Sequence, residues 1–273
     1  MSRGKTWFDA LATQVLPSPY ASVAIADANL GAGLGDGQVA RLLAVVPDPE
    51  SRFPRARAGE VGLLECIGLG GAVREVTQQD RGLADDQRRP IVAIVDVPSQ
   101  AYGRREEELG EFLYMAAAVD AYATARFAGH PVIALVVGSA ISGGFLAHGF
   151  QASQILALND AGVEIHAMHK PAAARITLRT VSELDELAKT VTPLSYDVRA
   201  WATLGQCDDL LSVSNADQPT SADVTLARDA LRAAVTRARQ GPRDLSNRLT
   251  SEQARHARAA SLMVQRRLTE QWS

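Results

Sequence analysis

Two largely apolar runs constrain the fold of this 273-residue chain more than any other feature. Residues 91–97 (IVAIVDV) and 132–137 (VIALVV) are rich in β-branched side chains, which is typical of strands buried on both faces of a sheet. The alanine-rich segment 106–127 between them predicts a helix, and a second helix is expected over about 143–151. This alternation of strands and helices favours parallel pairing through right-handed crossovers.

The remaining segments extend this α/β pattern and end in a helical region. Further strands are predicted at residues 21–26, 41–46, 155–158 and 163–166. Further helices are predicted at residues 6–16, 60–77, 182–189, 195–204, 222–239 and 251–269. We therefore expect a single α/β domain over residues 1–273, with a helical C-terminal part over about 171–273.

Composition and charge exclude several classes of function. A formal net charge of −3 provides no general attraction for a polyanion, so nucleic acid is not an expected partner. Neither of the two cysteines, Cys66 and Cys207, lies in a metal-ligand spacing, and together they cannot form a disulfide framework, which fits a cytoplasmic protein. Residues 1–16 lack the features of a signal peptide, and no segment reaches the roughly 20 apolar residues of a membrane span. His166 and His169 have no acidic or cysteine partner at ligand spacing, so no metal site is expected.

The strongest local signal for chemistry is the sequence GSAISGG at residues 138–144, directly after the second apolar run. Small residues at such a junction let backbone N–H groups face a ligand, and two such donors would stabilise a developing oxyanion. The same glycines are equally consistent with close packing of a helix on its sheet. Ser142 lacks the glycine two residues earlier that a nucleophile elbow needs, so we expect its hydroxyl to hydrogen-bond the loop or a ligand.

A second loop, residues 96–103 (DVPSQAYG), leaves the carboxyl end of the first apolar strand, the edge where open α/β sheets bind ligands. Arg104 and Arg105 follow it and are better explained as solvent-facing charges than as a phosphate site. Glycines at residues 31–37 superficially resemble a dinucleotide fingerprint, but there a strand follows the glycines instead of preceding them, so we reject that interpretation.

The two loops together resemble those of the crotonase-like superfamily and its carboxyltransferase subunits. The matching positions are Asp96, Pro98, Tyr102, Gly103, Gly110, Gly138, Ala140 and Gly143. The chain departs from the family pattern at Ser99, where glycine is usual, and at Ser139, where lysine is frequent.

Longer segments narrow the resemblance. Residues 43–49, 52–57, 142–149, 166–168 and 172–175 are together similar to the gamma subunit of biotin-independent malonate decarboxylase, with the similarity covering most of residues 5–270. This resemblance implies a crotonase-type ββα superhelix paired with a homologous beta subunit. It also implies a malonyl substrate carried as a thioester on the CoA-derived prosthetic group of an acyl carrier protein, an acyl carrier transferase subunit, and no cofactor or metal bound by this chain.

The resemblance places enolate-facing amides at Gly143 and Gly144, with Ser142 beside them as the third catalytic candidate. The candidate substrate-binding residues are Pro98, Ser99, Gln100, Tyr102, Gly103 and Gly138. Two alternatives stay open: a carboxyltransferase subunit of a biotin-dependent complex, and a non-catalytic subunit that completes the active site of the beta subunit. A hydratase is disfavoured because Glu164 has no second carboxylate to form the pair that activates water.

Overall fold

The computed structural model describes residues 2–31 and 39–272, so the glycine-rich segment at residues 31–37 lies largely outside the described part. The described strands form one mixed sheet in the order β1-β2-β3-β4-β5-β6-β8, and β7 pairs with the end of β5. Their bounds are β1 Gln14–Leu16, β2 Val23–Ala28, β3 Ala40–Val45, β4 Ile91–Val97, β5 Val132–Ile141, β6 Gln154–Leu158, β7 Glu164–His166 and β8 Asp209–Leu211.

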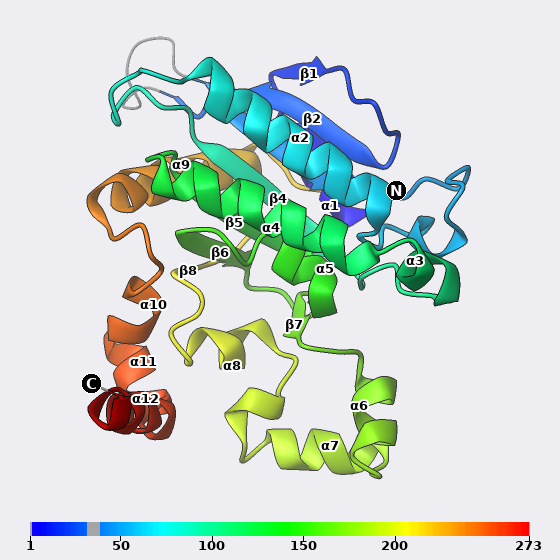
Figure 1. Cartoon of the computed structure of the whole chain (residues 1–273), viewed down its shortest axis with the longest axis vertical. Coiled ribbons are helices and arrows are strands. Elements are labelled where there is room, and N and C mark those ends of the chain that lie inside the picture. Colours follow the sequence, from blue (N-terminus) through cyan, green and yellow to red (C-terminus); the bar gives the residue numbers. More distant parts are fainter. Residues whose placement is uncertain (1, 32–38, 273) are drawn as a thin grey trace.

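The sheet is antiparallel at one edge and parallel elsewhere. β1, β2 and β3 pair antiparallel, whereas β3, β4, β5, β6 and β8 pair parallel in that order. Parallel pairing needs a crossover, and helices α2 (Leu63–Gln79) and α4 (Glu111–Phe127) supply two of them. These two helices lie side by side over one face of the sheet, while α1 (Arg3–Leu11) and α9 (Ser221–Gln240) lie behind the other face (Figure 1). The expected α/β architecture is confirmed.

The central strands are buried on both faces, as their composition predicts. Leu42, Ile94 and Leu135 on β3, β4 and β5 are completely inaccessible to solvent. Trp7 of α1 closes the core on the far face, and its indole N–H donates to the carbonyl of Ala216 at 2.8 Å. The two candidate loops, which follow β4 and β5, therefore start from strands that are held firmly in the core.

Three of the helix and strand boundaries predicted between residues 6 and 144 are wrong. The helix expected over residues 6–16 ends at Leu11, and residues 14–16 instead pair with β2, which gives their backbone groups partners that an isolated helix end lacks. The helix expected over 106–127 is divided into α3 (Arg104–Glu108) and α4, because Gly110 adopts a left-handed backbone with φ of 81°. β5 continues to Ile141 through the predicted loop, since β7 pairs with its last three residues.

The C-terminal part is helical as expected, but it also contains β8, which extends the sheet beside β6. The helix expected over 251–269 is broken at Arg258 into two helices. The remaining helices are α5 Ser142–Ala147, α6 Lys170–Ile176, α7 Val181–Ala188, α8 Val198–Ala202, α10 Asn247–Thr250, α11 Glu252–Ala257 and α12 Ala259–Trp272, with short 3₁₀ turns at Pro54–Ala56 and Thr192–Leu194. Among the described helices, none combines the length and apolar character needed to cross a bilayer.

Candidate active site

A cavity of about 550 Å³ opens where β5 ends and α5 begins. Three predicted site residues, Gln100, Ser142 and Gly143, line it. The other lining residues come from α5 and its C-terminal turn, from β7 and the residue after it, and from the 193–204 region: Phe145, Leu146, Phe150, Ile165, His166, Ala167, Pro193, Leu194, Ser195, Trp201 and Leu204. The structure thus brings residues from both candidate loops to one cavity.

The cavity wall is largely apolar and carries no formal charge. Phe145 lies with its ring centre 5.2 Å from Phe150 and 6.1 Å from Trp201, in the tilted and edge-on arrangements that aromatic pairs prefer. No lysine, arginine, aspartate or glutamate occurs among the described residues that line the cavity. His166 is the one ionisable lining side chain among them, and burial lowers its pKa below the ordinary 6.5, so it is neutral at pH 7.

The carboxamide of Gln100 bridges the two loops. Its Oε1 accepts a hydrogen bond from the Gly143 backbone N–H at 3.0 Å and from the Ser142 hydroxyl at 3.1 Å. The backbone on either side of Gln100 is fixed to Val61, whose N–H donates to Ser99 at 3.0 Å and whose carbonyl accepts from Ala101 at 2.9 Å. Gln100 therefore holds the first turn of α5 against a firmly tethered loop.

Ser142 makes the sharp change of direction from β5 to α5. Its φ of 63° is in the left-handed region, which costs a non-glycine residue about 1 kcal/mol or more. Its hydroxyl donates to Gln100, in agreement with the predicted hydrogen-bonding role, and no nucleophilic role is indicated. Strain of this kind is often found at functional sites, and here it occurs at a residue that lines the cavity.

The two candidate glycines occupy different environments. Gly143 lines the cavity, and a Cβ there would lie 2.2 Å from Gln100 Oε1 and 2.5 Å from the Met115 methyl group, both ends of flexible side chains. Gly144 is not among the lining residues, and a Cβ there would lie 2.5 Å from the Ser99 carbonyl oxygen. Close packing therefore explains Gly144, and the catalytic roles of both glycines stay predictions.

Gly138 and Asp96 have a structural relationship that sequence inspection did not reveal. The Asp96 carboxylate accepts from the backbone N–H of Ser139 at 3.1 Å and from that of Gly4 in α1 at 2.9 Å. A Cβ on Gly138 would lie 2.1 Å from the same carboxylate. This carboxylate ties α1 to β5, and Gly138 leaves the space for it.

The other predicted substrate-binding residues do not line the cavity. Ser99 is buried beneath Gly144, Tyr102 is 54% exposed, and Gly103 lies beside Glu106 and Arg55. Pro98 is half-buried, one residue before Ser99. A role in contacting substrate stays a prediction for these residues and for Gly138.

His166 lies in the cavity wall, a position that neither its rejected role as a metal ligand nor its place in the family-like segment 166–168 predicted. His166 pairs with Ile141 in the β5–β7 register, which places it beside Ser142. Its ring stacks on Tyr196 with centres 4.0 Å apart, and the Tyr196 hydroxyl donates to the Met168 carbonyl at 2.6 Å. Only the pairing of β7 with β5 could have revealed this position.

His148 lies outside the cavity wall and is completely buried. Its ring nitrogens lie 3.0 Å from the Tyr122 hydroxyl and 3.0 Å from the Ile94 carbonyl. Burial lowers its pKa to about 4, so the neutral ring accepts from Tyr122 and donates to Ile94. This arrangement is a satisfied core histidine.

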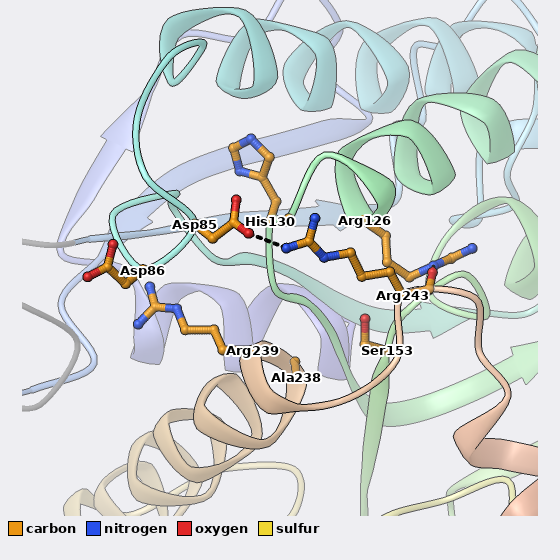
Figure 2. A pocket seen from close by; sticks show the side chains of 9 residues that line it. Asp85, Asp86, Arg126, His130, Ser153, Ala238, Arg239 and Arg243 are labelled. Atoms are coloured by element: carbon orange, nitrogen blue, oxygen red, sulfur yellow. Dashed lines mark hydrogen bonds and ion pairs between the residues drawn. The ribbon is translucent and has the colours of Figure 1, made fainter.

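A second cavity, of about 190 Å³, lies where the end of α9 meets the end of α4, and its charged side chains are shown in Figure 2. Arg126 donates to the backbone carbonyls of Arg243 and Gln151, at 2.7 and 2.5 Å. Arg243 forms an ion pair with Asp85. These interactions join the chain after α9 to α4 and to the segment between α2 and β4, so we interpret this cavity as part of a structural joint. In the described part of the chain, no cluster of three or more His, Cys, Asp or Glu side chains is arranged to hold a metal ion.

Known proteins match this chain over its whole length. It is 51% identical to a chain of a Pseudomonas malonate decarboxylase hetero-tetramer in complex with coenzyme A, with 100% of both chains covered and a TM-score of 0.91. A chain of the Pseudomonas malonate decarboxylase hetero-dimer matches with the same identity and coverage and a TM-score of 0.88. A chain of transcarboxylase 12S matches at 19% identity with a TM-score of 0.62. The match covers 88% of this chain and 40% of the transcarboxylase chain, and it shows that the two share a fold.

A curated relative from Malonomonas rubra, named malonyl-S-ACP:biotin-protein carboxyltransferase, is 37% identical over 161 residues. The alignment covers 59% of this chain and about half, 55%, of that protein. The family model described as the malonate decarboxylase gamma subunit matches residues 56–272. This chain therefore belongs to the malonate decarboxylase gamma subunit family, within the crotonase-like carboxyltransferase fold.

Proposed function

We propose that this chain acts with a homologous beta subunit to decarboxylate a malonyl thioester, without biotin, to the acetyl thioester and CO₂. One observation carries the proposal: the cavity combines an uncharged, largely apolar wall with hydrogen-bond donors at Ser142 and Gly143. Family membership supplies the substrate, because the cavity alone would suit other acyl groups.

The chemistry fits this combination. Loss of CO₂ breaks the bond between the carboxyl carbon and the α-carbon, and the electron pair moves onto the thioester oxygen as an enolate. A preorganised donor at that oxygen stabilises the charge where it develops. A wall without cations gives the starting carboxylate no ion pair, which favours its conversion to neutral CO₂. The enolate then takes a proton at its α-carbon to form the acetyl thioester.

The proposed partners follow from the relatives. Solved Pseudomonas malonate decarboxylase complexes are a hetero-dimer and a hetero-tetramer, and one contains coenzyme A. We propose a homologous beta subunit, an acyl carrier protein whose CoA-derived prosthetic group carries malonyl, and an acyl carrier transferase subunit for this chain. This chain itself is proposed to bind no cofactor and to work in the cytoplasm.

A biotin-dependent carboxyltransferase subunit is the second candidate, favoured by the name of the Malonomonas relative. The two functions differ in where the carboxyl group goes. Avidin should leave CO₂ release from the malonyl thioester unchanged if the first proposal is right, and should abolish turnover if biotin accepts the carboxyl group.

A pair of variants at Gly143 tests whether this chain takes part in catalysis. G143P removes the backbone N–H at a position in the first turn of α5, where no bond within the helix is lost. Because proline also restricts the backbone of the residue before it, Ser142, assembly and melting temperature are compared between the variants together with turnover. G143A adds a Cβ at the same place but keeps the N–H, so it controls for crowding. In complexes co-expressed with the neighbouring reading frames, loss of one oxyanion donor is expected to lower turnover by about 10²–10³-fold in G143P relative to G143A. Equal turnover of two fully assembled complexes would support the purely structural role.

A further inference from the structure

The Gln100 side chain occupies the position that an acyl oxygen needs in the proposed reaction. Its Oε1 is an amide carbonyl oxygen, with the same trigonal geometry and partial negative charge as a thioester carbonyl oxygen. It accepts from both donors at this end of the cavity, the Gly143 N–H at 3.0 Å and the Ser142 hydroxyl at 3.1 Å. Within the described structure, the Gly143 donor on which the proposed function depends is thus already engaged.

We propose that Gln100 is an internal substitute for the substrate carbonyl, which holds the two donors in the empty site and rotates away when the malonyl thioester binds. The inference rests on the proposed function, because it assumes that the acyl oxygen binds at Gly143. It assigns Gln100 the role of setting substrate affinity, which differs from the general substrate contact expected for its loop.

The surroundings of Gln100 restrict this movement to its side chain. Hydrogen bonds to Val61 fix the backbone on both sides of Gln100. Ser99 is buried and its carbonyl packs against Gly144, so the loop has no space to shift as a whole. The Gln100 side chain, however, lines a cavity of about 550 Å³ and can rotate into it.

The Gln100 side chain also explains why the Gly143 N–H and the Ser142 hydroxyl are not left unpaired at the edge of an apolar cavity. An unpaired buried donor is costly, so an internal acceptor stabilises the empty site and keeps the strained Ser142 turn in place. The same acceptor competes with substrate, because its hydrogen bonds must break before the thioester oxygen can form them. Two ordinary hydrogen bonds correspond to about a 5- to 100-fold reduction in apparent affinity.

Binding of a non-reactive acetyl-pantetheine thioester to the assembled complex tests the proposal by calorimetry. Q100A and Q100M both remove the acceptor oxygen, and Q100M keeps nearly the same length and volume. Both variants should bind the thioester about 5- to 100-fold more tightly than the unmodified chain, and Q100E should bind it more weakly because a carboxylate is a stronger acceptor. Q78A, at an exposed position of α2, is the matched control and should bind as the unmodified chain does.

Unchanged or weaker binding by both Q100A and Q100M, with assembly and melting temperature preserved, would overturn the proposal. Weaker binding would instead make the Gln100 amide a direct contact of the substrate. The amide ¹⁵N–¹H signal of Gly143 provides a check independent of ligand, since it should shift in Q100A and Q100M without any thioester. Failure of the proposed function is distinguished by the Gly143 pair: equal turnover of G143P and G143A defeats the catalytic role, whatever Gln100 does.

Discussion

Replacing Gly144 by alanine should show how tightly the loop at Ser99 is packed on α5. The new Cβ would lie 2.5 Å from the Ser99 carbonyl oxygen and 2.8 Å from its carbon, well inside the 3.4 Å at which ordinary contact begins. That oxygen also accepts from Val61, so it cannot move without losing a backbone hydrogen bond. Overpacking against fixed backbone costs about 3 kcal/mol, and the gain in helix propensity returns at most about 1 kcal/mol.

We therefore expect the free energy of unfolding of G144A to fall by about 2 kcal/mol. Gly71 in α2 is the matched control, because a Cβ there meets no atom within 4 Å. G71A should be more stable than the unmodified chain by about 0.5–1 kcal/mol. Urea unfolding of the purified chains measures both values.

G144A should also lower turnover of the complex, since contact with the fixed Ser99 carbonyl displaces the first turn of α5, which carries the Gly143 N–H. A displacement of about 1 Å at a reacting centre can reduce a rate by 10²-fold. If G144A is as stable as G71A and fully active, the packing explanation of Gly144 is wrong.

Three other perturbations follow from the same structure. Glu111 is buried, and burial, then the neighbouring Glu107 and Glu106, raise its pKa from 4.5 to about 7. The folded chain thus retains a proton that the unfolded chain loses, so the free energy of unfolding falls as pH rises from about 4.5 to 7. Urea unfolding should show E111Q more stable than the unmodified chain by about 1–2 kcal/mol at pH 8 and equally stable at pH 4. D96A should lower the free energy of unfolding by about 2–4 kcal/mol, because two backbone N–H groups lose a charged acceptor. A loss well below about 2 kcal/mol in urea unfolding would contradict that role of Asp96. R248A removes donors to the Phe150 and Ala152 carbonyls and should speed proteolysis within residues 247–272, which mass spectrometry would locate; unchanged cleavage would show that α10 is held by other contacts.

Much of the candidate site could be predicted from local sequence. The small residues after the second apolar run, together with the loop after the first, led to Ser142, Gly143 and Gln100, and the structure brings these three to one cavity. The aromatic wall could not be predicted, because Trp201 lies more than 50 residues beyond Phe145 and reaches it only through the folding of the 170–204 region. His166 likewise enters the cavity wall only because β7 pairs with the end of β5.

The sequence by itself determined the parallel core and the family, since strands buried on both faces need continuous β-branched runs and family loops consist of adjacent residues. Tertiary structure decided what each glycine is for. Whether Gly138, Gly143 or Gly144 faces a carboxylate, a cavity or a backbone oxygen depends on residues more than 40 positions away. Local sequence records that a side chain is absent at such a position, and only the packed neighbour gives the physical reason for its absence.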